Sequence, residues 1–413
     1  MGILMVKDRF LSYVAFDTAS DEESETVPST AKQKKLGAFL VGELKAAGLS
    51  DAMMDERGYV YAHLAATAGR EGEPVLALIA HMDTSPAASG AGIRPSEVLV
   101  TGEDIRLANG TVISIHDTPE LKSLSGERLI VTDGNTLLGA DDKAGVAEIV
   151  ETVARFASDP ALSHPGIAVC FTPDEEIGRG ADYVDLARLG ADYGYTVDGG
   201  VVGEIEYENF NAASAKVVFH GVNIHPGSAK GVMKNACLML RDYLDRLPKD
   251  EDPAHTDGYE GFYHVTGVRG EETEAEVRMI LRDHDRALFE KKKETVLAIA
   301  REVESLWGAG TVTATVTDSY YNMKEKVLPY LFLVEDAEEA MTACGVTPRV
   351  QPIRGGTDGA RLSFMGLPCP NLSTGGINFH SVRECIPVSS LDKMVEVLIR
   401  LVSKKRPART DKA

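Results

Sequence analysis

Three consecutive acidic residues, Asp174, Glu175 and Glu176, directly follow a short apolar run near the middle of the chain. The run, IAVCF at residues 167–171, predicts a buried strand that ends at Pro173. Adjacent glutamates at a strand end place two carboxylates in one small volume, so that one can bind a cation while its neighbour transfers a proton. A lone acidic pair is more often a solvated turn, and the sequence does not choose between the two glutamates. The catalytic interpretation therefore depends on matching groups elsewhere in the chain.

A histidine and an aspartate, His81 and Asp83, follow a second apolar run, PVLALIA at residues 74–80. Residues two apart on an extended chain point to the same side, so this imidazole and this carboxylate can address one site. His81 is then a candidate metal ligand, and Asp83 is a candidate for orienting an imidazole by hydrogen bonding. By itself the pair is a weak signal, because a histidine at a strand end is often only structural.

Two adjacent aspartates, Asp141 and Asp142, precede a predicted helix at residues 144–156. One of them can bridge two cations while the other caps the helix N-terminus. The sequence does not say which is which, and taken alone the pair is more often a double cap.

Asp198 in VDGG and His380 in INFHSVRE complete the set of candidate ligands. Neighbouring glycines let the backbone turn sharply and approach a ligand closely. Two histidines and at least three carboxylates, each after a strand-like or glycine-rich segment, indicate a common site. Mixed imidazole and carboxylate ligands suit zinc, with cobalt or manganese as substitutes.

The elements that must position these groups alternate between strand and helix along the first half of the chain. Helical spacing of apolar residues predicts helices at 5–17 and 31–48, and a further strand is expected at 193–197. This alternation predicts an α/β sheet whose strands carry the site at their carboxyl ends.

A different pattern begins near residue 211 and predicts an inserted α+β domain of the ferredoxin-like βαββαβ type. Its elements are expected at 215–219, 232–247, 263–268, 275–281, 285–306 and 311–317. The predicted domains are therefore a catalytic domain at 1–209 and 321–413 and an inserted lid or dimerisation domain at 210–320.

Composition and charge exclude several classes of protein. The chain has 413 residues and a net charge of −20, and it has no basic face that would bind nucleic acid. Its one basic cluster, residues 404–412, is interpreted as a solvated tail. Five scattered cysteines indicate reduced thiols. With no signal peptide and no membrane span expected, the sequence predicts a soluble cytoplasmic protein.

Ordered motifs along almost the whole chain resemble one enzyme family. They include IAHMDTSP, LLGADDKAG, FTPDEEIGRGA, TVDGG, NFNAAS, HPGSAKGVM, GFYH, IRGGTDGA and MGLPCPNL. In order and spacing they are similar to those of the peptidase T family, the tripeptide aminopeptidases among the di-zinc M20 metallopeptidases.

The resemblance implies roles that the sequence alone leaves open. It implies that Glu175 is the general base and that Asp83 orients His81. It also implies two Zn²⁺ ions per subunit, with Asp141 bridging both. Their ligands would be His81 and Asp198 for one ion, and Glu176 and His380 for the other.

For substrate binding, the resemblance implies that His225 stabilises the oxyanion. It also implies a homodimer, in which this histidine can reach the site from the second subunit. Arg282 and Arg354 are candidates for binding the carboxylate of a short peptide, because a guanidinium suits that group, and Asn211 is a weaker candidate. One departure from the family pattern lies after His380, where Ser381-Val382-Arg383-Glu384 stands in place of Gly-Lys-His-Glu. The resemblance therefore does not fix the geometry of this loop or the substrate preference.

The predicted function is metal-dependent release of the N-terminal residue from tripeptides. Two alternatives remain: another di-zinc amidohydrolase, either a dipeptidase or an N-acyl amino acid hydrolase, and a peptide-binding protein without catalysis. Free and blocked peptides discriminate among them, as does loss of activity in a Glu175→Ala variant.

Overall fold

The computed structural model describes residues 5–407, which divide into two compact units. Within that range, the first unit comprises residues 5–207, 325–351 and 357–407, and the second comprises 208–324 and 352–356. The short segment 352–356 belongs to the second unit because Ile353 forms a parallel bridge with Asn209. The sequence had placed this segment in the catalytic domain.

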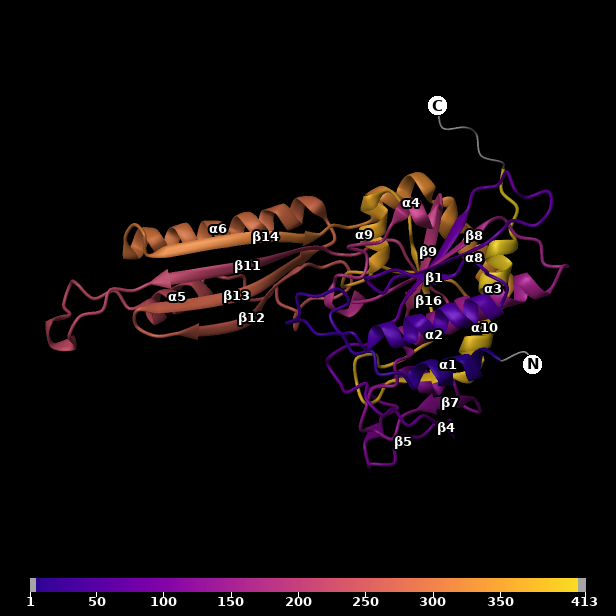
Figure 1. Cartoon of the computed structure of the whole chain (residues 1–413). Helices are drawn as coiled ribbons and strands as arrows, with labels where there is room; N and C mark the ends of the chain where they lie inside the picture. The colour runs from indigo at the N-terminus through magenta and orange to yellow at the C-terminus, as the bar shows by residue number, and fades with distance from the viewer. Residues whose placement is uncertain (1–4, 408–413) are drawn as a thin grey trace. The chain divides into compact units, whose positions relative to one another are not determined.

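A mixed eight-stranded sheet forms the centre of the first unit, with the strand order β1-β2-β8-β3-β9-β16-β10-β15 (Figure 1). Strands β8, β3, β9 and β16 are parallel to their neighbours within this run. The strands are β1 (Met53–Met54), β2 (Val60–Leu64), β3 (Leu76–His81), β8 (Ile167–Thr172), β9 (Tyr193–Gly199), β10 (Glu204–Glu206), β15 (Arg349–Val350) and β16 (Asn371–Ser373). The parallel strands bring their carboxyl ends to one edge of the sheet.

Helices pack against this sheet through apolar side chains. Alternate strand residues such as Ala77 and Ile79 lie in a buried cluster with Leu189 and Leu362 from two helices, α4 and α9. Helix α3 contacts β3 and β9, and it also packs against α1 and α10. The helices are α1 (Val6–Val14), α2 (Gln33–Ala46), α3 (Ala140–Ser158), α4 (Leu186–Leu189), α7 (Lys324–Val327), α8 (Phe332–Ala343), α9 (Asp358–Met365) and α10 (Val388–Ser403).

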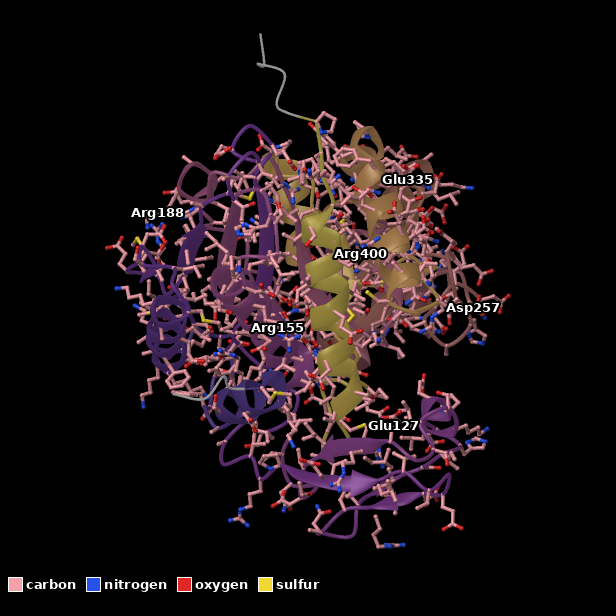
Figure 2. All side chains as sticks on the ribbon, turned by 90° about the vertical axis from the view of Figure 1, so that its right-hand side faces the viewer. Glu127, Arg155, Arg188, Asp257, Glu335 and Arg400 are labelled. Atoms are coloured by element: carbon pink, nitrogen blue, oxygen red, sulfur yellow. The ribbon has the colours of Figure 1, made fainter. Side chains whose placement is uncertain are left out.

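Helix α10 contacts both α3 and α8. Figure 2 shows it carrying Arg400 between Arg155 of α3 and Glu335 of α8. Its buried face includes Leu391, Met394 and Leu398.

A small three-stranded sheet, ordered β17-β7-β4, lies beside the main one in the first unit. It is formed by β4 (Ser96–Leu99), β7 (Arg128–Val131) and β17 (Cys385–Pro387), and a separate pair is formed by β5 (Ile105–Arg106) and β6 (Val112–Ile113). The sequence did not predict that β17 would pair with β7. That pairing supports the segment which follows His380.

The second unit is a four-stranded antiparallel sheet, ordered β12-β13-β11-β14, with two helices on one face. Its elements are β11 (Asn211–His220), α5 (Ala236–Leu244), β12 (Phe262–Gly270), β13 (Glu274–Asp283), α6 (Arg286–Trp307) and β14 (Val312–Tyr320). The predicted βαββαβ order is confirmed. Helix α5 begins later than the expected residue 232 because the side chain of Asn235 caps it by accepting the N–H of Leu238.

The interpretation of residues 404–412 as a solvated tail is wrong for the first of them. Lys404 and Arg406 both form ion pairs with Asp336, which is nearly buried. The guanidinium of Arg406 also lies over the rings of Tyr193 and Phe332. Residues 408–412 lie outside the described part of the chain.

Four short 3₁₀ helices complete the described elements: η1 (Pro119–Lys122), η2 (Glu175–Ile177), η3 (Pro226–Ser228) and η4 (Leu328–Tyr330). Between residues 5 and 407, no helix has both the length and the apolar character needed to cross a bilayer.

Candidate metal and catalytic site

The predicted ligands come from segments at one edge of the main sheet. His81 is the last residue of β3, and Asp198 lies near the end of the neighbouring strand β9. Glu176 lies in the turn η2, four residues after the end of β8. Asp141 stands at the start of α3, and His380 lies in the loop between β16 and β17. The structure thus gathers residues that are up to three hundred positions apart in sequence.

These five residues form two groups of potential metal ligands that share one member. His81, Asp141 and Asp198 form the first group, and Asp141, Glu176 and His380 form the second. Within each group, one donor atom from each residue lies within 4.8 Å of the others. Asp141 therefore occupies the position that a carboxylate bridging two cations requires.

The two oxygens of Asp141 each face a different histidine. Oδ1 lies 2.9 Å from Nε2 of His81, and Oδ2 lies 3.0 Å from Nε2 of His380. The same Nε2 atom of His81 is 3.3 Å from Asp198, while that of His380 is 2.8 Å from Glu176. The second oxygen of Glu176, Oε1, is buried without a hydrogen-bond partner among the described residues. Imidazole nitrogens and carboxylate oxygens that converge in this way fit two divalent cations of the zinc class.

The electrostatics of the site reflect this crowding of acids around imidazoles. Burial alone lowers the pKa of His81, but Asp198 and Asp141 outweigh burial and hold that pKa above its ordinary value. Contacts with Asp141 and Glu176 raise the pKa of His380 to about 10. Burial raises the pKa of both Glu176 and Asp198 to about 7. The cluster thus has a strong attraction for positive charge.

The adjacent Asp142 has a different environment from Asp141. Its Oδ2 accepts the backbone N–H of His81 at 3.0 Å, and its Oδ1 accepts the N–H of Gly145 at 3.2 Å. The bond to Gly145 is a helix-capping bond to the third residue along the chain. The structure therefore directs Asp141 toward the histidines and Asp142 toward the backbone.

Asp83 links the two strand ends that carry the site. Its Oδ1 lies 3.3 Å from Nδ1 of His81 and accepts the backbone N–H of Glu175 at 3.0 Å. Its Oδ2 accepts the N–H of Glu176 at 3.2 Å. Burial, reinforced by the charge of Asp198, raises the pKa of Glu175 well above its usual range. Glu175 is thus a carboxyl group suited to accept a proton beside the predicted ligands.

Two buried acids near the site had no role in the sequence interpretation. Asp174 accepts the N–H of Ser29 at 2.6 Å and the side-chain amide of Gln33 at 2.6 Å, so it attaches the turn η2 to the N-terminal region. Asp358 accepts the hydroxyl of Thr172 at 2.7 Å, and burial raises its pKa to about 6. In the sequence, Asp174 is the first of the three acids that follow the apolar run, and Asp358 lies in the motif IRGGTDGA.

The four predicted substrate-binding residues all lie in the second unit. Asn211 donates to the carbonyls of Asp283 and His284, both at 3.0 Å. Arg354 donates to backbone carbonyls, including that of Gly258 at 2.8 Å. Their contacts are structural, and their role toward substrate stays a prediction.

The remaining two candidates also have local contacts. Arg282 donates to the carbonyl of Leu281 at 3.0 Å and lies over the ring of Tyr320. His225 accepts the N–H of Gly227 through Nδ1 at 3.1 Å. Neither contact involves a carboxylate.

The loop that departs from the family pattern is closed by its own side chains. The hydroxyl of Ser381 donates to the carbonyl of Asn378 at 2.8 Å, and Nε of Arg383 donates to the carbonyl of Val112 at 2.9 Å. His380 itself has a φ of 59°, a left-handed conformation that is uncommon for a residue other than glycine. The hydrogen bonds of Ser381 and Arg383 thus hold this loop.

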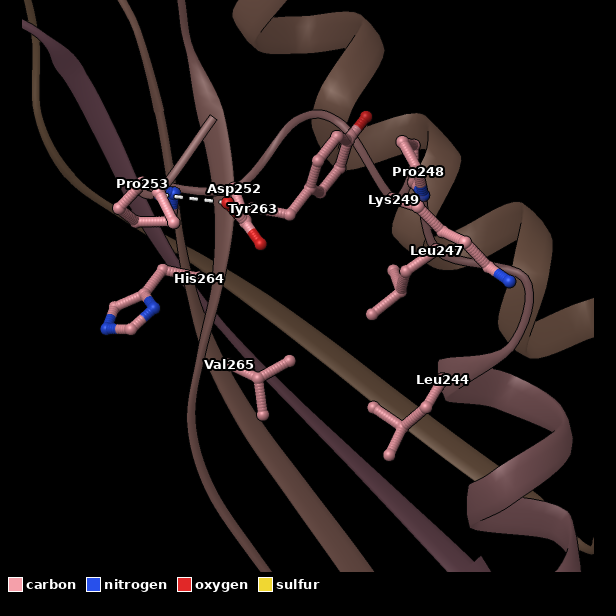
Figure 3. Close-up of a pocket in the computed structure, with 10 residues that line it drawn as sticks. Leu244, Leu247, Pro248, Lys249, Asp252, Pro253, Tyr263, His264 and Val265 are labelled. Atoms are coloured by element: carbon pink, nitrogen blue, oxygen red, sulfur yellow. Dashed lines mark hydrogen bonds between the residues drawn. The ribbon is translucent and has the colours of Figure 1, made fainter. Parts of the chain in front are cut away.

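A pocket of about 470 Å³ lies elsewhere, within the second unit (Figure 3). Figure 3 shows Leu244, Leu247 and Val265 on its apolar side, with Lys249 and His264 at its margin. None of the predicted site residues lines this pocket.

Known peptidases are similar to this chain in sequence and in fold. The profile of the peptidase family M20/M25/M40 matches residues 131–404. The peptidase T of Clostridium acetobutylicum is 51% identical over 400 residues, which are 96% of this chain and 98% of that protein. A tripeptidase structure from Staphylococcus aureus matches with a TM-score of 0.76 at 21% identity, covering 96% of this chain and 97% of the other. A dinuclear metal-binding peptidase of the M20 family from Bacillus subtilis matches with a TM-score of 0.65 at 14% identity over 96% of each chain.

Proposed function

The chain belongs to the peptidase family M20/M25/M40, and from this we infer that it is an aminopeptidase that removes the N-terminal residue from tripeptides. The observation that carries this inference is 51% identity to a peptidase T over almost the whole of both chains. The two ligand groups at the sheet edge support it, because hydrolysis of a peptide bond by this family needs a site that binds metal.

The metal site that we propose consists of His81 and Asp198 for one Zn²⁺, Glu176 and His380 for the other, and Asp141 for both. The grouping of the donor atoms supports this division, and zinc is the cation that best suits two imidazoles among carboxylates. When bound, the two ions would polarise the scissile carbonyl and lower the pKa of a water molecule.

The chain's own acids would then handle the protons. The carboxylate of Glu175 accepts a proton from the attacking water and then delivers it to the nitrogen of the leaving amine. Asp83 keeps His81 in one orientation and holds the backbone of Glu175 and Glu176 through two N–H bonds. The residue that orients His81 therefore also holds the backbone from which the carboxylate of Glu175 extends.

For recognition of the tripeptide, we propose Arg282 and Arg354 for its carboxylate and His225 for the oxyanion, with Asn211 in a supporting role. The basis is the family resemblance and the chemistry of the guanidinium and imidazole groups. Each arginine would exchange a bond to a backbone carbonyl for a stronger bond to a charged carboxylate.

We further propose a cytoplasmic homodimer. All five cysteines are free thiols, which suits a reducing compartment.

Within the described residues, β12 is at one edge of the sheet in the second unit, and such a strand offers unpaired backbone groups to a second copy. Sedimentation at assay concentration tests the dimer, and a fully active monomer would exclude it.

The deciding experiment is hydrolysis of one unblocked tripeptide beside its N-acetylated form, after chelation and again after zinc is restored. Cleavage of the free tripeptide alone, abolished by chelation and restored by zinc, is the expected result. Cleavage of the acetylated peptide instead would move the substrate to the N-acyl amino acid class. If a zinc-bound protein cleaves neither peptide, a non-catalytic binding protein becomes the better interpretation.

A further inference from the structure

One buried carboxylate, that of Glu384, accepts three backbone N–H groups from the segment that leads into α3. Its Oε2 accepts from Leu138 and Gly139, both at 2.7 Å, and its Oε1 accepts from Asp141 at 3.0 Å. Only 1% of Glu384 is exposed. Bonds of this kind between a charged acceptor and backbone donors are about twice as strong as neutral ones.

The backbone that Glu384 holds cannot satisfy these N–H groups by itself. The first N–H groups of any helix have no partner within the helix. Gly139 adopts a left-handed conformation with φ of 79°, and Asp141 has a ψ of 104°, which is outside the helical range. The backbone is therefore irregular at Asp141, and the side chain of Glu384 fixes it there.

Glu384 also lies close in sequence to a second ligand. It is four residues after His380, and the next residue, Cys385, begins β17 and forms a bridge with Ile377. The bridge between Ile377 and Cys385 thus closes a loop that contains both His380 and Glu384. One side chain connects the backbone of Asp141 to the segment that carries His380.

We propose that Glu384 is a positioning residue that sets the affinity of the protein for both metal ions by fixing the backbone of Asp141. The proposal rests on the metal site proposed above. Because Asp141 belongs to both ligand groups, displacement of its backbone weakens both positions rather than one. Glu384 itself belongs to neither group, so it acts only through Asp141.

The test is zinc binding to metal-free protein, measured by competition with a chromogenic chelator. In Glu384→Gln, an amide NH₂ replaces one oxygen, so at least one of the three N–H groups faces a donor instead of an acceptor. Loss of a partner outside the ligand shell typically costs about 10–100-fold in metal affinity. We expect a loss in this range for both ions, and an intermediate loss for Glu384→Asp, which keeps the charge on a shorter side chain.

Asp55→Asn is the matched control, since Asp55 also accepts two backbone N–H groups in the first unit, from Arg57 and Tyr59. It should bind zinc as the wild type does. Wild-type affinity in Glu384→Gln, or a loss confined to one of the two ions, would overturn the proposal.

Hydrogen exchange separates positioning from general loss of structure. In Glu384→Gln the amides of residues 138–141 should exchange faster while those of β3 and β9 keep their protection. Equal exchange at 138–141 in variant and wild type would overturn the proposal, and so would loss of protection throughout the first unit in both Glu384 variants. The zinc measurement uses no peptide, so it can succeed even if the tripeptide assay fails.

Discussion

The carboxylate of Asp83 accepts the backbone N–H of Glu175, with 3.0 Å between Oδ1 and the nitrogen. The same oxygen lies 3.3 Å from Nδ1 of His81, so one atom contacts both a predicted metal ligand and the backbone of the predicted base. Asp83 is completely buried, which strengthens these interactions because water does not screen them. The relative positions of base and ligand thus depend on one side chain.

Replacement of this side chain by its amide tests that dependence. Asp83→Asn should lower kcat/KM for a tripeptide by about 10–100-fold, because it removes the charge that orients His81 and turns a donor toward an N–H group. Asp285→Asn is a suitable control, since Asp285 caps α6 in the second unit by accepting the N–H of Leu288. An Asp83→Asn enzyme with activity within twofold of the wild type would show that the contact is dispensable.

The adjacent glutamates should separate into two roles when each is replaced by glutamine. Glu175→Gln should lower kcat by about 10²–10⁴-fold, because a glutamine cannot accept the proton, while two zinc ions remain bound. Glu176→Gln should instead lower the zinc content after dialysis, since Oε2 of Glu176 faces the same His380 that would bind the ion. The two variants are isosteric neighbours and control for each other. If Glu175→Gln lost zinc and Glu176→Gln kept it, the assignments would be reversed.

The sequence predicted the long elements well because each is long enough to show either a continuous apolar run or a periodic apolar pattern. In β3, every residue from Leu76 to His81 is buried, and the run of apolar residues was a sufficient signal. Strands such as β16 and β17 have three residues each, too few for any periodicity to appear. The pairing of β17 with β7 joins residues some 250 positions apart, for which the local sequence has no signal.

For the site, residue types at strand ends were enough to predict the cluster but not the direction of each side chain. Asp141 and Asp142 are chemically identical neighbours, and only the backbone turns one toward His380 and the other toward Gly145. Glu384 ends the segment INFHSVRE, yet its contact with residue 141 depends on tertiary packing across 243 positions. Chemistry at a strand end can therefore be predicted locally, whereas the partners that hold it in place cannot.

The ordered contacts of Arg406 predict that the end of the chain contributes to stability. Its guanidinium pairs with Asp336 and lies 5.1 Å from the ring centre of Tyr193, so Arg406→Ala should lower the free energy of unfolding by about 1–3 kcal/mol. Arg406→Lys keeps the charge but not the planar contact, and it should lose less. Urea denaturation gives the comparison, with Arg400→Ala on the exposed side of α10 as the control. Equal unfolding of Arg406→Ala and Arg400→Ala would mean that these contacts add nothing.

Glu206 in β10 should make the stability of the first unit depend on pH. Burial raises its pKa to about 7, while a hydrogen bond from Nδ2 of Asn371 at 2.8 Å partly opposes the shift and Glu204 adds to it. Because the pKa in the folded state is above the usual value of 4.5, folding takes up a proton. The stability that the neutral group contributes is complete below pH 4.5 and is lost as the pH rises toward 7.

Over that interval the wild type should lose up to about 3 kcal/mol relative to Glu206→Gln, whose side chain has no charge to bury. Urea denaturation of both proteins at pH 5, 6, 7 and 8 measures the difference. Glu335→Gln, at an exposed position on α8, is the matched control and should follow the wild type at every pH. A constant difference between wild type and Glu206→Gln from pH 5 to 8 would show that Glu206 is already ionised in the folded protein. The cost of burying the ionised carboxylate of Glu206 would then have to be offset by Asn371 and the strand backbone. That compensation would exceed what one hydrogen bond provides.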